Sequence, residues 1–594
     1  MSEQNKNEAG GEAPDLAANM ARIAARSQDL VRAFMSRQSE GGIGVGNPMN
    51  VSDAFLDMTA KMMADPAKLV EAQIDLWRSY TELWQHTARR MAGQDSEPLV
   101  TPEPGDRRFK DPAWEENVVF DFIKQSYLLT ARWMRTTVND VEGLDEATAR
   151  KVDFYTRQFA DALAPTNFAL TNPEVLRETI ASKGENLAKG LENLLEDLEA
   201  GQGIKMTDPD AFQVGGNIAV SPGQVIFRND MMELIQYAPT TEEVRKRPLL
   251  MIPPWINKYY ILDLKPKNSL VKWATDQGHT VFMISWVNPD ERLADKSFAD
   301  YMMEGPLAAL DAIEKATGER EVTAMALCLG GTLLAATLAY MAATGDERIK
   351  AACLMATLVD FSEPGELAVF VDAEQIEALE QRMAESGGIL DGATMASTFN
   401  MLRANDLIWS FVVNNYLMGR DPFPFDLLYW NADSTRMPGK MHGFYLRNMY
   451  RDNLLREPGG IELAGVKIDI SKITIPIYVM GAREDHIAPW RSTYAARALF
   501  GGPVRFVLAG SGHIAGVVNP PEPGKYPHWT NSRAAKDPEV WLSKAERHDG
   551  SWWPDWCKWN ARHAGPLVPA RVPGTGALPA LAPAPGTYVL EKAR

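Results

Sequence analysis

The stretch TAMALCLGG, residues 323–331, decides which fold the chain is expected to adopt. An apolar run with strand character leads into Cys328, two glycines follow it, and an apolar run from Thr332 predicts a helix. A strand, a tight turn and a helix with a nucleophile at the apex form a nucleophile elbow. The turn needs small residues two positions before and two after the nucleophile, which here are Ala326 and Gly330. The stretch therefore predicts an α/β fold with Cys328 as its nucleophile.

The thiol at the apex narrows the expected chemistry. A thiolate is a strong nucleophile and a good leaving group, so it suits an enzyme that forms an acyl-enzyme and then gives the acyl group away. A small buried Cys between a strand and a helix would show the same local pattern, because free Cys is among the most buried residue types. The rest of the chain has to separate these two interpretations.

Composition excludes several classes of protein. The chain has 594 residues, 45% hydrophobic and 23% charged, with a net charge of −17, which indicates a globular protein of more than one domain. The negative charge argues against nucleic acid or an anionic membrane as the main partner. The three cysteines form no disulfide framework, and the N-terminus has no signal-peptide pattern, so a cytoplasmic protein is expected.

No metal or cofactor site is predicted, because the sequence has no Cys/His spacing for zinc, no P-loop and no dinucleotide-binding motif. Residues 322–345 carry no charge and resemble a membrane span in hydropathy. The two glycines inside this run favour a buried strand followed by a buried helix instead, so no transmembrane segment is expected.

Composition also divides the chain. Residues 1–15 are polar and predicted to be disordered, and residues 16–203 follow a helical pattern that predicts an all-α domain. Residues 204–565 alternate strand-like and helix-like runs, which predicts a mostly parallel sheet. Within them, residues 361–470 lack a strong strand and form a predicted cap, or lid, insertion. Residues 566–594 are rich in Pro and Ala and predict a poorly ordered tail.

Strands are expected at residues 224–227, 232–237, 248–252, 280–286, 322–327, 349–357, 475–481 and 504–509. Together with the elbow, this succession is typical of an α/β-hydrolase catalytic domain, in which the nucleophile, the acid and the histidine follow one another in that order. His513 follows the last strong strand, and Asp485 follows the strand before it. The sequence therefore predicts a Cys328–His513–Asp485 triad.

Other residues could fill these roles. Asp360 ends the strand after the elbow and is an alternative acid, although Asp485 is preferred. His442, His486 and His528 also lie after Cys328; His486 adjoins Asp485, so the two side chains would point apart. The other cysteines, Cys353 and Cys557, are interpreted as packing residues.

Several further stretches resemble the single-chain, class I polyhydroxyalkanoate (PHA) synthases. They are DRRFKDPAW (106–114), PTNFALTNPE (165–174), PPWINKYYILD (253–263), SWVNP (285–289), YWNAD (429–433) and DHIAPW (485–490). The resemblance covers most of residues 106–565. One position departs from the pattern: the family's box is commonly G-x-C-x-G-G, and here Ala326 replaces the first Gly.

This resemblance implies an acyltransferase that polymerises (R)-3-hydroxyacyl-CoA, expected to be 3-hydroxybutyryl-CoA, through an acyl-Cys328 thioester. The CoA thioester is the substrate, and no separate cofactor is expected. The oxyanion requires N–H donors; Leu329, after the nucleophile, is the first, and Ile256, in the loop after the strand at 248–252, is the second. No residues are assigned to CoA binding.

The resemblance also implies a homodimer in the cytoplasm that associates with the growing polyester in PHA granules and with phasin-type proteins. Two alternatives remain at this point. A thioesterase or polyester depolymerase of the same fold would favour Ser at the elbow, and a non-catalytic granule protein would lack a triad member.

Overall fold

The computed structural model describes residues 48–64, 66–201, 203–533 and 535–592. The predicted disordered segment, residues 1–15, and the helical prediction up to residue 47 lie outside them.

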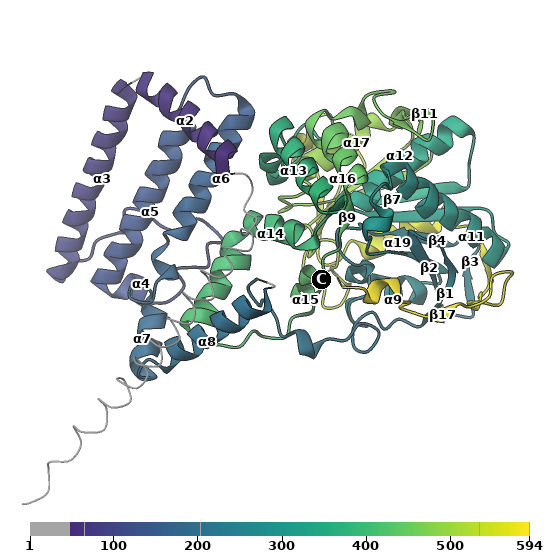
Figure 1. Cartoon of the computed structure of the whole chain (residues 1–594), viewed down its shortest axis with the longest axis horizontal. Helices are drawn as coiled ribbons and strands as arrows, with labels where there is room; N and C mark the ends of the chain where they lie inside the picture. The colour runs from purple at the N-terminus through teal and green to yellow at the C-terminus, as the bar shows by residue number, and fades with distance from the viewer. Residues whose placement is uncertain (1–47, 65, 202, 534, 593–594) are drawn as a thin grey trace, which may run out of the picture. The chain divides into compact units, whose positions relative to one another are not determined.

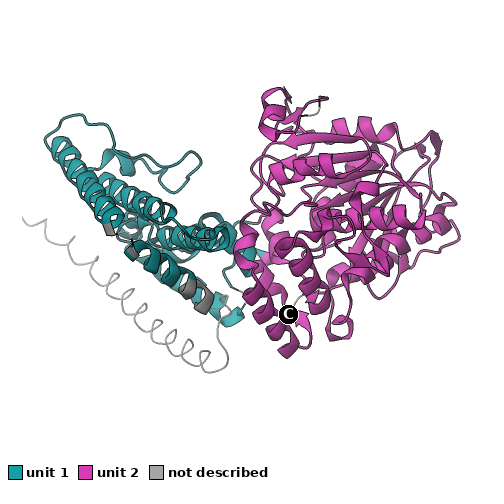
Figure 2. Ribbon diagram, turned by 90° about the horizontal axis from the view of Figure 1, so that it is seen from above, with its two compact units in different colours: residues 1–208, 397–423 teal, residues 209–396, 424–594 magenta. Residues whose placement is uncertain are grey.

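The chain forms two compact units, coloured separately in Figure 2. Unit 1 comprises residues 1–208 and 397–423, and unit 2 comprises residues 209–396 and 424–594. Residues 397–423 come from within the predicted cap insertion, so part of that insertion belongs to the N-terminal unit. Hydrogen bonding explains this, because the Asn186 side chain donates to the Leu417 carbonyl at 2.8 Å.

Unit 1 is helical, as predicted, and α3, α5 and α6 lie side by side (Figure 1). Its helices are α2 (Pro48–Ala64), α3 (Pro66–Met91), α4 (Ala113–Glu116), α5 (Val118–Asn139), α6 (Glu146–Ala162), α7 (Pro173–Ala181) and α8 (Glu185–Ala200). Side chains of Asn117, Asp145 and Asn172 cap the N-termini of α5, α6 and α7 by accepting backbone N–H groups.

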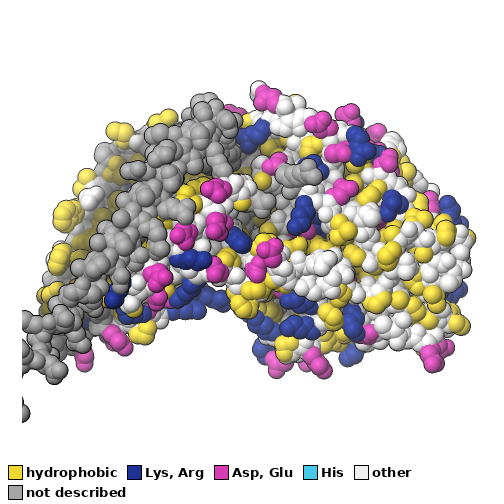
Figure 3. Space-filling model, turned by 60° about the horizontal axis from the view of Figure 1, so that its bottom comes forward, with side chains coloured by type: hydrophobic (Ala, Val, Ile, Leu, Met, Phe, Trp, Pro, Cys, Tyr) yellow, Lys and Arg dark blue, Asp and Glu magenta, His cyan; other side chains and the backbone are white. Residues whose placement is uncertain are grey.

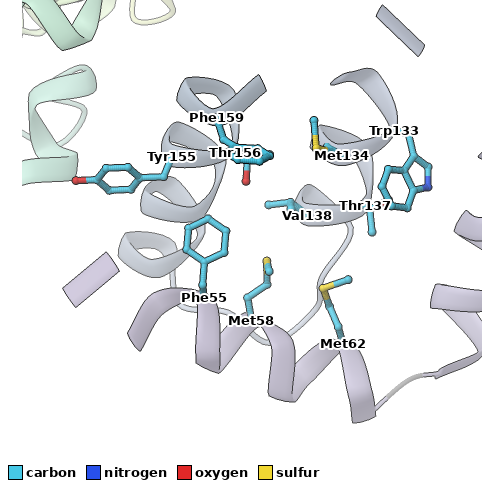
Figure 4. Close-up of a pocket in the computed structure, with 10 residues that line it drawn as sticks. All are labelled: Phe55, Met58, Met62, Trp133, Met134, Thr137, Val138, Tyr155, Thr156 and Phe159. Atoms are coloured by element: carbon cyan, nitrogen blue, oxygen red, sulfur yellow. The ribbon is translucent and has the colours of Figure 1, made fainter. Parts of the chain in front are cut away.

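An apolar cavity of about 540 Å³ lies between α2, α5 and α6. Figure 4 shows Phe55, Met58 and Met62 of α2 pointing toward side chains of the other two helices. Its remaining lining residues are Trp133, Met134, Thr137, Val138, Tyr155, Thr156 and Phe159. None of these ten residues is a Cys, His, Asp or Glu, so the cavity offers no thiol and no carboxylate or imidazole acid–base group.

Unit 2 contains an 11-stranded sheet in the order β15-β14-β13-β12-β7-β6-β4-β5-β2-β1-β17. The six strands from β13 to β5 run parallel, which confirms the predicted mostly parallel sheet. The strands are β1 (Gly223–Arg228), β2 (Met232–Tyr237), β4 (Leu249–Ile252), β5 (Val281–Trp286), β6 (Val322–Leu327), β7 (Ile349–Met355), β12 (Ile477–Ala482), β13 (Val504–Ala509), β14 (His528–Thr530), β15 (Glu546–His548) and β17 (Ala582–Pro583).

Helices cover both faces of this sheet. Along β6, Ala324 and Ala326 belong to the core cluster that includes residues of α11, α12 and α17, whereas Met325 and Leu327, which point to the opposite face, belong to the cluster that includes residues of α9 and α19. The helices are α9 (Leu270–Asp276), α10 (Phe298–Met302), α11 (Ala308–Thr317), α12 (Leu329–Thr344), α17 (Trp490–Leu499), α18 (Pro538–Ser543) and α19 (Trp553–Ala561). Because both faces of β6 are buried, the sequence of this strand is almost continuously apolar.

The predicted cap insertion is largely helical. It contains α13 (Ala373–Glu385), α14 (Gly392–Leu402), α15 (Asp426–Ala432) and α16 (Gly439–Tyr445), with two small ladders, β8 (Ile389–Leu390) with β9 (Met437–Pro438) and β10 (Glu462–Leu463) with β11 (Val466–Lys467). None of the four strands joins the large sheet, as expected for an insertion into it.

The C-terminal segment differs from the predicted tail. Strand β17 pairs with β1, and β16 (Leu567–Pro569) pairs with β3 (Glu243–Arg245). The buried Glu233 carboxylate accepts the backbone N–H groups of Thr587 and Tyr588 at 2.9 and 3.1 Å. Pro/Ala-rich composition did not reveal these contacts, since they depend on residues several hundred positions earlier.

Among the residues that the structure describes, no helix combines the length and the apolar character that a membrane span requires.

Gly190 tests the packing of α8 against residues 412–417. A Cβ at this position would lie 1.9 Å from the Tyr416 carbonyl oxygen, so Gly190→Ala must push the two segments apart. We expect the free energy of local opening of α8 to fall by about 1–3 kcal/mol. Hydrogen exchange of α8 peptides measures it. Glu196→Ala, on the exposed side of α8, is the control and should change this free energy by less than about 0.5 kcal/mol.

Candidate active site

Cys328 stands at a sharp turn between β6 and α12. Its backbone has φ 51° and ψ −120°, a conformation that is strained for a residue with a Cβ and that characterises the nucleophile elbow. The Cys328 N–H donates to the Met355 carbonyl at 2.9 Å, and the Cys328 carbonyl accepts from Gly331 and Thr332. The turn is thus held from both sides, and the thiol is half-buried.

Glycine is required at positions 330 and 331 because other parts of the chain approach both positions closely. A Cβ on Gly330 would lie 2.4 Å from the carbonyl oxygen of Ile252, and one on Gly331 would lie 2.0 Å from the Thr357 hydroxyl. The start of α12 therefore contacts the backbone at the end of β4. Ala326, where the family pattern commonly has Gly, is fully buried in β6 beside Ile252.

Asp485 and His513 meet at the same edge of the sheet. They follow β12 and β13, which are parallel neighbours, so both loops emerge on one side. His513 Nδ1 lies 2.7 Å from Asp485 Oδ2. Asp485 Oδ1 accepts the backbone N–H groups of Ile487 and Ala488 at 2.9 and 2.8 Å, which fixes the carboxylate. Both side chains are buried.

The Cys328 sulfur also influences the pKa of the His513 imidazole. Burial opposes the charged imidazolium, but the Asp485 carboxylate and the Cys328 sulfur outweigh it and hold the pKa of His513 well above its usual value. Asp485 is thus hydrogen-bonded to His513, and the Cys328 sulfur contributes to the raised pKa of the same imidazole.

The predicted oxyanion donors occupy suitable backbone positions. Leu329 is the first residue of α12, and Ile256 lies in the loop that follows β4. Within the described part of the chain, neither N–H donates to a backbone or side-chain acceptor.

The alternative acid, Asp360, is engaged elsewhere. Its carboxylate accepts from Ser362, Asn453 and Arg456, and the Arg456 pair is 3.1 Å long. These bonds account for its position in the loop after β7 without a role for His513.

The other candidate histidines are also separate from the pair. His442 is buried in α16, where burial lowers its pKa to about 4 and keeps it neutral. His528 lies in β14 and bonds the Gly550 carbonyl through Nδ1 at 2.9 Å. The His486 carbonyl accepts the backbone N–H of Glu366, which ties the Asp485 loop to the insertion.

Sequence reasoning missed a support of the His513 loop. The indole N–H groups of Trp552 and Trp553 donate to the carbonyls of Gly516 and Val517 at 3.0 and 2.9 Å. Both tryptophans are fully buried. The only sign of this support in the sequence is the Trp-rich stretch at 552–559. The sequence does not show which residues contact it, so it could be interpreted only as packing.

Two tyrosines of the insertion were missed as well. Burial raises the pKa of Tyr445 and of Tyr450, and the Cys328 sulfur contributes in both cases. The negative charge of Asp485 also raises the pKa of Tyr450. Tyr445 is buried and Tyr450 is partly buried, and their rings lie 5.5 Å apart. Groups of three or more His, Cys, Asp or Glu able to hold a metal are absent from the residues that the structure describes.

Two family models match the chain. One, "Poly-beta-hydroxybutyrate polymerase (PhaC) N-terminus", covers residues 105–274, and the other, "alpha/beta hydrolase fold", covers residues 248–520. The second match agrees with the parallel sheet and elbow of unit 2 and confirms the predicted fold.

Curated relatives extend the match to nearly the whole chain. A poly(3-hydroxyalkanoate) polymerase of Methylorubrum extorquens is 56% identical over 89% of this chain and 88% of its own length. The polymerase of Rhizobium meliloti is 50% identical over 97% of this chain and 95% of its own length. That of Cupriavidus necator is 43% identical over 94% of each chain.

Asp485→Asn tests the electrostatics of the pair. The amide carries no charge, so we expect the pKa of His513 to fall toward and below its usual value, because burial then dominates. An NMR titration of the His513 ring protons measures this pKa, and Asp360→Asn is the matched control. A pKa that moved equally in both variants, or only in the control, would contradict the assignment of Asp485.

Proposed function

The chain belongs to the poly(3-hydroxyalkanoate) polymerase family, and from this premise we propose that it polymerises (R)-3-hydroxyacyl-CoA into a polyester and releases CoA. The expected substrate is (R)-3-hydroxybutyryl-CoA. The observation that carries the proposal is the thiol of Cys328 at a strained turn, beside a buried His513 that is bonded to Asp485.

In the first half-reaction, Cys328 attacks as a thiolate, since His513 holds the proton that the thiol gave up. The thiolate sulfur bonds to the carbonyl carbon of the substrate thioester, and the carbon–sulfur bond to CoA breaks. The His513 proton passes to the CoA sulfur, so CoA leaves as a free thiol. The acyl group remains on Cys328 as a thioester.

Acylation changes the electrostatics of His513. The sulfur loses its negative charge, so one of the two groups that raise the His513 pKa is gone and the neutral imidazole can accept a proton. It takes the proton of the 3-hydroxyl of an incoming hydroxyacyl-CoA, and that oxygen attacks the acyl-Cys328 carbonyl. An ester forms, Cys328 leaves as a thiolate beside the imidazolium, and the lengthened acyl-CoA acylates Cys328 again.

The tetrahedral intermediate of each step carries an oxyanion. We assign its stabilisation to the N–H groups of Leu329 and Ile256, which have no protein acceptor among the described residues. Thioester exchange is nearly balanced in energy, and formation of the ester makes the cycle favourable. The insertion limits the access of water, which would otherwise release free hydroxy acid.

The proposal also covers the oligomeric state of the protein and its location in the cell. We expect a cytoplasmic homodimer that associates with polyester granules and phasin-type proteins. Apolar side chains exposed along α3 support contact with an apolar surface: Val70, Ile74, Trp77, Trp84 and Met91. Figure 3 shows hydrophobic side chains among charged ones of both signs on one face. Sedimentation with isolated granules and ultracentrifugation test these points; a monomer that stays in the supernatant contradicts them.

Cys328→Ala removes the proposed nucleophile. We expect release of CoA from (R)-3-hydroxybutyryl-CoA and formation of insoluble polymer to fall together by at least about 10⁴-fold. Thiol titration and polymer mass measure the two products. Cys557→Ala, at a half-buried cysteine whose pKa is raised by burial, is the matched control and should keep both activities.

The products decide between polymerase and hydrolase. Release of CoA with only free 3-hydroxybutyrate would make the chain a thioesterase. Loss of activity in both cysteine variants would remove the support for Cys328 as the specific nucleophile.

A further inference from the structure

A segment of the insertion is bound to the loop that follows β4. Asn257 and Ser434 form an antiparallel bridge. The Asn257 side chain donates to the Trp430 carbonyl at 3.3 Å, and the Trp430 indole N–H donates to the Lys258 carbonyl at 2.7 Å. Residues 430–435 and 255–258 are therefore joined by backbone and side-chain bonds although about 170 positions separate them in the sequence.

Thr435 holds two successive carbonyls of this loop. Its hydroxyl donates to the Trp255 carbonyl, and its backbone N–H donates to the Ile256 carbonyl at 2.9 Å. Thr435 is buried, as is Trp255. Water therefore cannot easily replace the hydroxyl as the partner of the Trp255 carbonyl.

The first of these bonds determines the direction of the Ile256 N–H. The Trp255 carbonyl and the Ile256 N–H belong to one peptide group, which is planar and trans, so they point in opposite directions. Fixing the carbonyl on the Thr435 hydroxyl fixes the N–H on the other side. That N–H has no protein acceptor within the described residues.

The elbow lies against the start of the loop that contains this peptide group. Gly330 contacts the carbonyls of Ile252 and Pro253, immediately before the loop. Residue 329, whose N–H is the first proposed oxyanion donor, is adjacent to that contact. A donor from residues 255–257 is therefore well placed to act with it.

We propose that Thr435 is a positioning residue that sets the orientation of the Ile256 N–H toward the oxyanion. The inference rests on the proposed function, because it assumes an acyl transfer at Cys328. Thr435 touches no reacting atom; it acts through the Trp255–Ile256 peptide group. The cap thereby helps to complete the active site as well as to cover it.

The loop has other anchors, so loss of the hydroxyl alone should not detach it. Thr435→Val keeps the backbone N–H bond to Ile256, and the contacts of Asn257 and Trp430 remain. The expected consequence is a freer rotation of one peptide group. This separates a positioning role from a role in folding.

The test compares Thr435→Val with Thr435→Ser, which keeps the hydroxyl, and with Thr337→Val. Thr337 is a buried residue of α12 whose hydroxyl donates to the Leu333 carbonyl at 2.7 Å, and it lies outside the proposed machinery. Steady-state release of CoA from (R)-3-hydroxybutyryl-CoA gives kcat and KM. The rate of Cys328 alkylation by iodoacetamide reports the thiolate independently, because alkylation forms no oxyanion.

For Thr435→Val we expect kcat to fall about 10- to 100-fold, less than the loss of a whole oxyanion donor, with KM within about threefold. Alkylation should stay within about twofold of wild type. Thr435→Ser should recover kcat to within about threefold, and Thr337→Val should keep it.

Two results overturn the inference and are distinguishable from failure of the proposed function. Turnover by Thr435→Val within about twofold of wild type shows that the hydroxyl does not orient the donor. A parallel loss of turnover and alkylation shows a general distortion of the site. If the wild-type chain itself releases no CoA, the proposed function fails, and this inference fails with it.

Discussion

The structure of the site depends on the turn at Cys328. A positive φ at a residue with a Cβ is maintained only because β6 and α12 are packed on both sides. That packing needs glycine at 330 and 331, where a Cβ would overlap the end of β4 and the Thr357 side chain. The same contact that permits the turn brings the first N–H of α12 beside the loop after β4.

Charge is concentrated where water is excluded. His513 is buried between Asp485 and Cys328, and its raised pKa follows from those two neighbours against the cost of burial. In the mechanism that we propose, acylation removes the sulfur charge and ester formation restores it, so the two steps shift the pKa of His513 in opposite directions. One imidazole can therefore hold a proton for the thiolate and later accept one from a hydroxyl.

The sequence predicts strands such as 322–327 and 504–509 well, because their apolar runs and the following glycines are local signals. Residues at strand ends, Asp485 and His513, could be proposed from chain order alone. Thr435, Trp552 and the return of residues 397–423 to unit 1 could not, since their bonds join distant segments. The C-terminal strands β16 and β17 could not be predicted for the same reason. They pair with strands far earlier in the sequence, and a Pro/Ala-rich composition gives no sign of that pairing.

The central claim is that Cys328 carries the acyl group. Acid quenching of the protein within its first turnovers on (R)-3-hydroxybutyryl-CoA, followed by mass spectrometry of the peptide 321–348, tests it most directly. The account predicts a 3-hydroxybutyryl adduct, or a short oligomer of it, on Cys328, labile to hydroxylamine. Release of CoA with that peptide unmodified, or with the adduct on another residue, would contradict it.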